Sequence, residues 1–329
     1  MKHVLVIPGD GIGPEVILPT VKVLSTIAPS LEFEIKHAGK DEFLRTGTSI
    51  SEELIDNARS ADAILFGATT SVRDDRYRSP ILVLRKELGL FANVRIAKNL
   101  IRSEKRIDIV VIRENTEGLY TGKEEMDDHG VTTFRRISKD ACARIVRFAF
   151  DWCVKNDRRK ILCVHKANVL RLSDGLFLDT FKTEAMRYPD IQASDALIDS
   201  TAMKMVMTPE EFDVLVTLNL YGDILSDLAA GLIGGLGFMP SANFGARNAL
   251  FEPAHGSAPD IVGKGLANPF ASLLSGAMLL EYFDMKHESR ALISSIEKTA
   301  NQIELVDRLG RCNTTNVIAG ILENLNHDT

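Results

Sequence analysis

Two aspartates lie one helical turn apart in the segment Asn219-Leu220-Tyr221-Gly222-Asp223-Ile224-Leu225-Ser226-Asp227. An apolar run precedes the segment, so we expect a helix that follows a strand. The spacing places both carboxylates on one helical face. Two like charges this close favour a cation between them, and oxygen ligands suit Mg²⁺ or Mn²⁺. The alternative is that both are ordinary acids near a helix N-terminus, where the helix dipole favours them.

A lysine and a tyrosine lie where predicted strands end, the edge at which open α/β sheets bind ligands. Lys166 follows the apolar run Lys160–His165, and Tyr120 lies beyond the strand predicted over Asp108–Arg113. Burial and neighbouring charge would turn such a lysine into a base, and a tyrosine beyond a strand end could donate a proton. A solvated lysine and a structural tyrosine are the alternatives.

Three arginines form a series along the chain. Arg85 and Arg95 flank Lys86-Glu87-Leu88-Gly89-Leu90-Phe91-Ala92-Asn93-Val94, and Arg113 opens Arg113-Glu114-Asn115-Thr116-Glu117. Guanidinium groups bind carboxylates with two parallel hydrogen bonds, so a set of arginines indicates a polycarboxylate ligand. Any one of them alone is more often a surface charge.

Glycine occurs in two segments with different implications. The turn Gly9-Asp10-Gly11-Ile12-Gly13-Pro14 lacks the spacing of the dinucleotide fingerprint G-x-G-x-x-G, and we interpret it as a tight structural turn near a ligand. The segment from Glu252 to Pro269 holds small residues, prolines and glycines, which predict a rigid loop whose backbone can approach a ligand. Asn268 and Pro269 then cap a helix.

Strands and helices alternate along the chain, which predicts an α/β fold with a largely parallel sheet. Strands are expected at 4–7, 63–66, 108–113, 160–165 and 213–219. Helices are expected from Pro14 to about residue 27 and at 51–59, 80–88, 139–155, 174–187, 223–233, 268–283 and 288–306.

Composition limits the function classes. The 329 residues carry 39 Lys plus Arg against 45 Asp plus Glu, a net charge of −6, which argues against general binding of nucleic acid or anionic membranes. No apolar run is long enough for a membrane helix, and the N-terminus has no signal-peptide pattern. The four cysteines show no metal spacing, as expected for reduced thiols in a cytoplasmic protein.

Together these motifs resemble those of the β-decarboxylating dehydrogenases, which include isocitrate, homoisocitrate and 3-isopropylmalate dehydrogenases. The resemblance runs from Ile7 to the helix after Asn268 and is most specific in the Asp223 segment and the His255 loop. It implies the isopropylmalate/isocitrate dehydrogenase-like fold, with two α/β domains, and not the Rossmann fold. Residues 1–90 and 235–329 would form the cofactor domain, and 91–234 the substrate, metal and dimerisation domain.

The resemblance also implies a role for each motif. Tyr120 and Lys166 resemble the acid–base pair, and Asp199, Asp223 and Asp227 resemble the ligands of Mg²⁺ or Mn²⁺. The residues that resemble the substrate-binding set are Ser79, Arg85, Arg95 and Arg113. Those that resemble the NAD-binding set are Asn168, Glu252, His255, Gly256, Ser257, Ala258, Pro259, Asp260 and Asn268.

The implied activity is NAD- and metal-dependent oxidative decarboxylation of a 2-hydroxy acid that carries a β-carboxylate. Asp260 stands where NAD-using relatives have an acid, although Arg308 and Arg311 depart from the family's pattern. Arg78 and Ser79 favour a substrate with a γ-carboxylate, isocitrate or homoisocitrate, over 3-isopropylmalate. Ile81 could contact an alkyl group, so 3-isopropylmalate is the alternative. A non-catalytic regulatory subunit is a third reading, which the retained site residues disfavour. Relatives form dimers that share their active sites, so we expect a homodimer or a multiple of dimers, with Lys166 and Asp199 reaching the partner's site.

Overall fold

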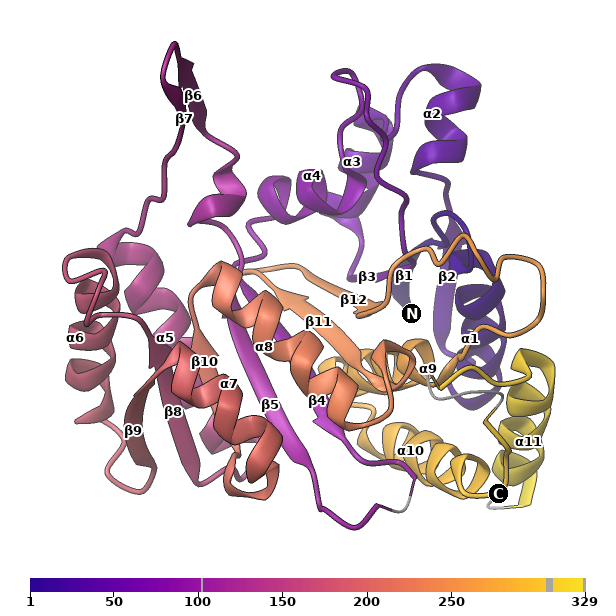
Figure 1. The fold of residues 1–329 in the computed structure, drawn as a ribbon. Coiled ribbons are helices and arrows are strands. Elements are labelled where there is room, and N and C mark those ends of the chain that lie inside the picture. Colours follow the sequence, from indigo (N-terminus) through magenta and orange to yellow (C-terminus); the bar gives the residue numbers. More distant parts are fainter. Residues whose placement is uncertain (102, 306–309, 328–329) are drawn as a thin grey trace. The chain divides into compact units, whose positions relative to one another are not determined.

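The computed structural model describes residues 1–101, 103–305 and 310–327, and the chain divides into two compact units. Unit 1 comprises Met1–Leu90, Asn99–Ser103 and Ile233–Thr329. Unit 2 comprises Phe91–Lys98 and Glu104–Leu232. Each unit has its own strands and helices, and each is described by itself (Figure 1).

Unit 1 is built on strands in the order β2-β1-β3-β12-β11. The first four strands run parallel, and β11 pairs antiparallel with β12. The residues of β1 from Val4 to Ile7 and all residues of β3 are buried and apolar, which suits strands covered on both faces, whereas the edge strand β2 is buried only at Leu31. The strands are β1 Lys2–Ile7, β2 Leu31–Ile35, β3 Ala63–Phe66, β11 Pro240–Phe244 and β12 Ala249–Pro253.

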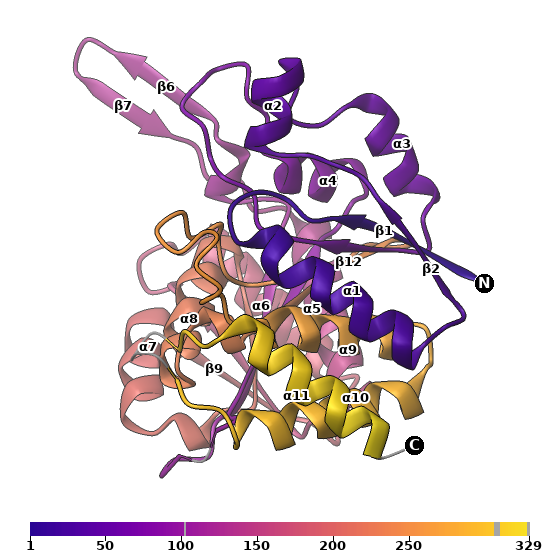
Figure 2. The same ribbon diagram turned by 90° about the vertical axis from the view of Figure 1, so that its right-hand side faces the viewer.

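Helices lie on both sides of the unit 1 strands (Figures 1 and 2). One side carries α3 and α4, whose Leu54, Ile55 and Leu84 pack in one cluster with Leu5 and Phe66 of the strands. The other side carries α1 with α9, α10 and α11. The helices are α1 Gly13–Ile27, α2 Lys40–Thr46, α3 Glu52–Ser60, α4 Pro80–Glu87, α9 Phe270–Tyr282, α10 Lys286–Ala300 and α11 Thr314–His327.

Unit 2 has strands in the order β4-β5-β10-β8-β9, of which β4 runs antiparallel to β5 and the rest are parallel. Helices α5 and α6 lie on one side, and α7 and α8 on the other (Figure 1). The hairpin β6–β7 projects from the unit, and all its strand residues are exposed. The strands are β4 Ala92–Lys98, β5 Asp108–Glu114, β6 Glu124–Asp127, β7 Gly130–Thr133, β8 Lys160–His165, β9 Gln192–Leu197 and β10 Val214–Thr217, and the helices are α5 Lys139–Lys155, α6 Ser173–Ala185, α7 Ile198–Met207 and α8 Asn219–Leu232.

The predicted α/β class is confirmed, and most predicted elements match within a few residues. Two helices differ more: α8 begins at Asn219 and not at residue 223, and α10 ends at Ala300 and not at residue 306, which lies outside the described residues. The sequence analysis also gave no range for β2, β4, β9, β11, β12, the hairpin, α2, α7 and α11. Among the described residues, no helix has the length and apolar character needed to cross a membrane.

The glycine-rich turn after β1 is a tight structural turn, as predicted. Gly9 and Gly11 have φ of +78° and +61°, and a Cβ on Gly11 would lie 2.1 Å from the carbonyl oxygen of Ser257. Between them, the buried Asp10 carboxylate accepts hydrogen bonds from the backbone N–H groups of Lys40, Asp41 and Thr70, at 2.8, 3.1 and 2.8 Å. Asp10 therefore joins three loops at the carboxyl ends of the unit 1 strands.

This arrangement predicts that Asp10→Ala destabilises unit 1. The substitution leaves three backbone donors without their acceptor, so we expect the free energy of unfolding to fall by about 2–4 kcal/mol. Urea denaturation followed by circular dichroism measures the change. Asp41→Ala, an exposed acid beside it, is the control and should change stability by less than about 0.5 kcal/mol. Equal stability of the two variants would contradict this role for Asp10.

Candidate functional site

Two arginines and two aspartates of unit 2 form one connected cluster. Arg113, on β5, is 1% exposed, and its guanidinium donates to Asn219 Oδ1 at 3.0 and 2.8 Å and to the Asp223 carboxylate. Arg95, on the neighbouring strand β4, donates to Asp227 Oδ1 at 3.1 Å and lies 3.5 Å from Asp223 Oδ1. Helix α8 thus places both carboxylates on the face that meets the arginines. Such a cluster holds two positive charges in place beside two sets of oxygen ligands.

Tyr120 belongs to the same cluster. It lies in a 3-10 turn, Leu119–Thr121, and its hydroxyl donates to the Asp223 carboxylate. The Arg113 guanidinium carbon lies 4.8 Å from the centre of its ring. Burial, and next the hydrogen bond to Asp223, raises the pKa of Tyr120. Since the phenol therefore keeps its proton at neutral pH, it can serve as a proton donor.

The segment that carries Tyr120 is held by two acids. Glu114 accepts from the N–H groups of Thr116 and Glu117, at 2.8 and 2.9 Å. Glu117 in turn accepts from the N–H of Ser138 at 2.7 Å. These bonds fix the path of the chain after β5, and with it the position of the tyrosine.

Lys166 and Asp199 form a separate ion pair in unit 2. Lys166 follows β8 and Asp199 lies in the first turn of α7, and Lys166 Nζ is 2.7 Å from Asp199 Oδ1. The hydrogen bond from Lys166 lowers the pKa of Asp199. Within the described part of this single chain, no group of three His, Cys, Asp or Glu side chains converges as a metal site. Asp199 therefore faces Lys166, and Asp223 and Asp227 face the arginines.

Unit 1 carries the other predicted substrate residues. Ser79 precedes α4 at the N-cap position, and Arg85 lies in the last turn of that helix. Arg85 donates to Glu252 Oε1 at 3.1 Å, and the same oxygen accepts from Asn243 Nδ2 at 2.7 Å. Glu252, predicted among the cofactor residues, is thus the partner that orients Arg85.

The predicted cofactor loop begins at His255. Nδ1 of His255 lies 3.0 Å from the carbonyl oxygen of Gly256, so Nδ1 carries the proton. Burial lowers the pKa of His255, and the ring is neutral. Its buried Nε2 is then an acceptor, with no hydrogen-bond donor among the described residues. A ligand that offers an N–H, such as an adenine amino group, would satisfy it.

The rest of the loop folds back on the glycine-rich turn and α9. The Ser257 carbonyl accepts from the N–H of Ile12 at 3.0 Å. Asn268 Oδ1 accepts from the N–H of Phe270, the first residue of α9, at 3.0 Å, but the N-cap position is Pro269, one residue later than the predicted cap. Asp260 lies 3.9 Å from Arg311. Arg308 lies outside the described residues, and Asn168 lies in unit 2, in the turn after β8.

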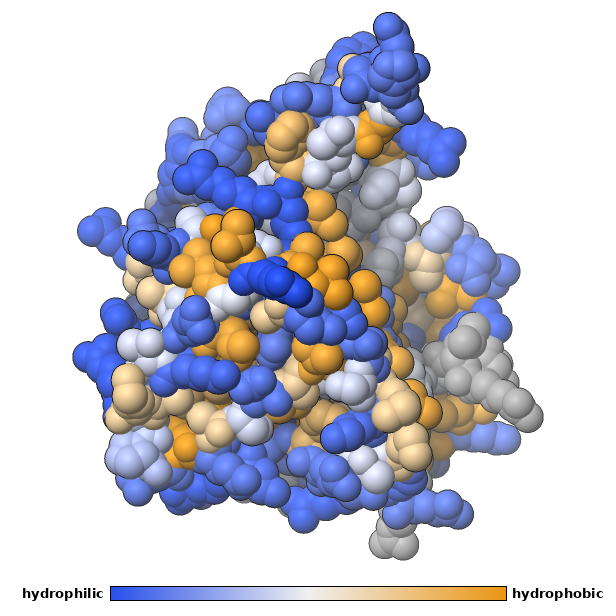
Figure 3. Space-filling view, turned by 60° about the vertical axis from the view of Figure 1, so that its left-hand side comes forward, coloured by the Kyte–Doolittle hydropathy of each residue, from blue (hydrophilic) through white to orange (hydrophobic). Residues whose placement is uncertain are grey.

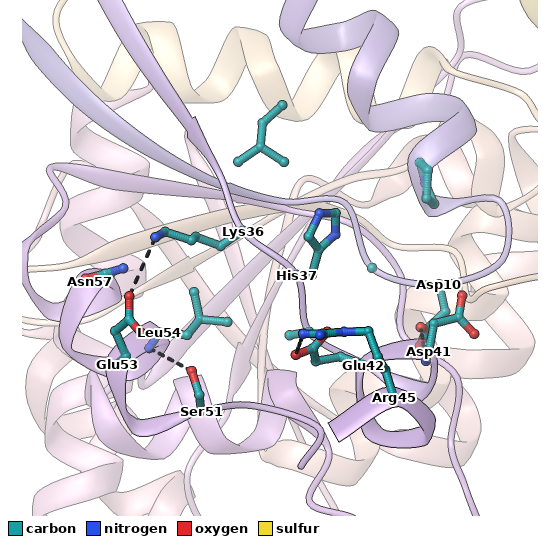
Figure 4. Close-up of a pocket in the computed structure, with 14 residues that line it drawn as sticks. Asp10, Lys36, His37, Asp41, Glu42, Arg45, Ser51, Glu53, Leu54 and Asn57 are labelled. Carbon is teal, nitrogen blue, oxygen red and sulfur yellow. Dashed lines mark hydrogen bonds and ion pairs between the residues drawn. The ribbon is translucent and has the colours of Figure 1, made fainter. Parts of the chain in front are cut away.

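A cavity of about 580 Å³ opens at the carboxyl ends of β1 and β2 in unit 1 (Figure 4). None of the predicted site residues lines it. Four of its charged side chains form two ion pairs: Arg45 with Glu42 at 2.7 Å, and Lys36 with Glu53 at 3.7 Å. A Rossmann fold has an acid at the end of its second strand for the cofactor ribose, whereas Lys36 and His37 follow β2 here.

The sequence analysis missed the uncharged residues that orient the arginines. Asn93 and Ser226 accept from Arg95 at 3.0 and 2.8 Å, and Asn219 accepts from Arg113. Spacing offered a signal: Asn93 is two residues from Arg95 on one strand face, and Asn219 is four residues from Asp223 on one helix face.

The comparisons with known proteins agree with one another. The family model "Isocitrate/isopropylmalate dehydrogenase" matches residues 3–319. A homoisocitrate dehydrogenase of Methanocaldococcus jannaschii is 48% identical over 90% of each chain, and a 3-isopropylmalate dehydrogenase of Methanothermobacter thermautotrophicus is 44% identical over 98% of each. The crystal structure of isocitrate dehydrogenase from Methylococcus capsulatus, 38% identical, matches 99% of each chain with a TM-score of 0.94.

Proposed function

This chain belongs to the isocitrate/isopropylmalate dehydrogenase family, and from that premise we propose that it decarboxylates isocitrate, homoisocitrate or both, with NAD and Mg²⁺ or Mn²⁺. The resemblance inferred from the motifs is confirmed, and the chain is a β-decarboxylating dehydrogenase. The cluster of Arg95, Arg113, Tyr120, Asp223 and Asp227 carries the proposal, because it joins carboxylate-binding cations, a proton donor and metal-type oxygen ligands.

The residues present fit a hard divalent metal ion. Asp223 and Asp227 offer carboxylate oxygens on one face of α8, and a third ligand, Asp199, would come from a second copy of the chain. When bound, the metal would polarise the substrate hydroxyl and stabilise negative charge that forms after loss of CO₂.

The His255 loop fits a dinucleotide. The unpaired Nε2 of His255 suits an adenine amino group, and Asp260 suits the ribose hydroxyls while repelling a 2′-phosphate. The carboxylate at 260 supports NAD over NADP, although Arg311, 3.9 Å away, partly offsets its charge. NAD would accept the hydride from the substrate's C2.

The chain's own residues then perform the remaining steps. Arg85, Arg95 and Arg113 bind and orient the substrate carboxylates. Lys166 removes the proton of the 2-hydroxyl as hydride leaves C2, which gives a 2-oxo acid with a β-carboxylate. Loss of CO₂ leaves an enolate, and Tyr120 protonates it at C3. The Asp223 carboxylate, which accepts from the Tyr120 hydroxyl, holds that proton donor in place.

A specific observation favours 3-isopropylmalate as the second candidate. On α4, Ile81 and Leu82 share a face with Arg85, at spacings of four and three residues. Leu82 is 45% exposed and offers an alkyl surface next to that arginine. Arg78, which we expect to favour a γ-carboxylate, also lies 3.6 Å from Glu52 of α3, an acid that would compete for it.

A dimer with shared sites accounts for the exposed apolar surface of unit 2. Figure 3, which brings this unit forward, shows hydrophobic side chains gathered among hydrophilic ones. Leu172 is 90% exposed and Val206, on α7, 55%. Such surface favours burial in a self-complementary interface.

The four cysteines are free and buried, which suits the cytoplasmic location that we propose. A regulatory subunit remains disfavoured, because Tyr120, Lys166 and the aspartates are all present.

The first prediction from this proposal concerns the metal. Excess EDTA, or Asp223→Asn, should lower kcat by more than about a hundredfold, because hydroxyl ionisation and enolate formation both need the cation. Steady-state NADH production measures it, and added Mn²⁺ should restore the chelated wild type but not the variant. Full turnover in chelator would remove the metal from the proposal.

The second prediction concerns substrate and cofactor. With isocitrate, homoisocitrate and 3-isopropylmalate, each with NAD and NADP, kcat/KM should be highest for a tricarboxylate with NAD. Isocitrate and homoisocitrate should differ by no more than about 200-fold, since one methylene is typically worth 1–3 kcal/mol. A preference for 3-isopropylmalate would establish the second candidate. A preference for NADP would contradict the proposal that Asp260 repels a 2′-phosphate.

The third prediction concerns the shared site. Lys166→Met and Tyr120→Phe, each nearly inactive alone, are unfolded and refolded together. Half of the dimers should be mixed, with one intact site each, so activity should return to about one quarter of wild type. If both residues served one site within a chain, the refolded mixture would be as inactive as its parents, despite proven subunit exchange.

A further inference from the structure

Asp174 is a fully buried acid near the start of α6 to which no role has been given above. Its carboxylate receives three donors from three other segments of unit 2. Arg135 Nη1 lies 2.6 Å from Oδ1, and the backbone N–H of Lys166 and the hydroxyl of Tyr221 lie 2.7 and 3.1 Å from Oδ2. A charge with no exposure must be paired in this way to persist.

The donors around Asp174 also contact one another. The Arg135 guanidinium carbon lies 5.3 Å from the centre of the Tyr221 ring. The Tyr221 hydroxyl donates to Asp174 Oδ2, so the tyrosine contacts both the acid and its arginine partner. Tyr221 lies on α8, two residues before Asp223. Asp174 therefore links the turn after β8 to the helix that carries both aspartates of the arginine cluster.

The turn at Lys166 is held at two successive peptide groups. Asp174 accepts from the N–H of Lys166, and Nδ1 of His165 accepts from the N–H of Ala167 at 3.0 Å. Because Nδ1 accepts, Nε2 of His165 carries the proton and donates to Asp195 Oδ2 at 3.2 Å. With both N–H groups fixed, the Lys166 side chain leaves the backbone in a set direction, toward Asp199 at 2.7 Å.

We propose that Asp174 is the positioning residue for Lys166: its buried carboxylate sets where the lysine's amino group stands when that group takes the proton. The proposal rests on the base role given to Lys166 above. A charged acceptor is needed because three donors converge on it, and an amide would present N–H where an acceptor is required. A shift of about 1 Å in a reacting group can cost a hundredfold in rate, so loss of this anchor should appear in kcat.

The first test compares kinetics of two buried acids on the same helix. Asp174→Asn should lower kcat by at least about tenfold while KM for the hydroxy acid changes by less than about threefold, because the arginines that bind substrate are untouched. The control is Glu184→Gln, a buried acid on α6 that pairs with Arg147 and Arg187 and does not contact the Lys166 turn. It should keep kcat within about twofold. Equal effects of the two variants would overturn the proposal.

Should Asp174→Asn fail to fold, Tyr221→Phe tests the same role with a smaller change to the buried hydrogen bonds. It removes one donor from Asp174 and leaves the carboxylate, Arg135 and the Lys166 N–H in place. We expect kcat to fall about two- to fivefold with KM unchanged, and a kcat equal to that of Glu184→Gln would contradict the proposal.

Subunit mixing shows through which group Asp174 acts. If Asp174 acts through Lys166, Asp174→Asn damages the site that receives this subunit's lysine, as Lys166→Met does. Refolding Asp174→Asn with Tyr120→Phe then restores activity, and refolding it with Lys166→Met does not. If it acts through α8, only the Lys166→Met mixture recovers, and the proposal is wrong. Mixing Lys166→Met with Tyr120→Phe checks the shared site separately. Should that control fail, the shared site is refuted, and the split between kcat and KM decides the role of Asp174.

Discussion

A buried guanidinium organises the candidate site. Arg113 is 1% exposed, and a charge removed from water in this way is costly unless polar partners surround it. Asn219 and Asp223 provide them from successive turns of α8. Helix α8 can come close enough only because residue 222 is glycine: a Cβ there would lie 2.6 Å from Arg113 Cβ and 2.4 Å from Thr217 Oγ1. The positions of Asp223, Asp227 and Tyr120 all depend on this contact.

Buried carboxylates play a similar part elsewhere in the chain. They accept hydrogen bonds from backbone N–H groups and so fix the loops that hold candidate site residues. Asp10 does this for the glycine-rich turn, Glu114 for the Tyr120 segment and Asp174 for the Lys166 turn. A carboxylate offers several acceptor positions, so one side chain can fix more than one segment. The strands provide rigid starting points, and the acids determine where the chain goes after each strand ends.

Local sequence pattern predicted many of the strands and helices and the shared face of the two aspartates. The pairing of site residues that are distant in sequence depends on tertiary contacts. Apolar runs found β3 and β8 because both are buried on two faces. They missed β4, where Asn93 and Arg95 interrupt the run, and β9, whose residues are mostly exposed. The predicted helix starts at residue 223, but Gly222 already lies inside α8, where its lack of a Cβ allows close packing. Spacing predicted that Asp223 and Asp227 share a face. It gave no sign that Arg113 would bind Asp223 or that Lys166 would bind Asp199, since each pair is distant in sequence.

The most direct measurement compares Gly222→Ala with Gly231→Ala, two glycines of the same helix. A Cβ at 231 meets nothing within 4 Å, so that variant should keep wild-type kcat and gain about 0.4–1 kcal/mol of stability. Gly222→Ala should push α8 from β5, displacing both Asp223 and Arg113, and lower kcat/KM by at least about a hundredfold. If Gly222→Ala turned over like Gly231→Ala, the buried arginine would not be what positions the site.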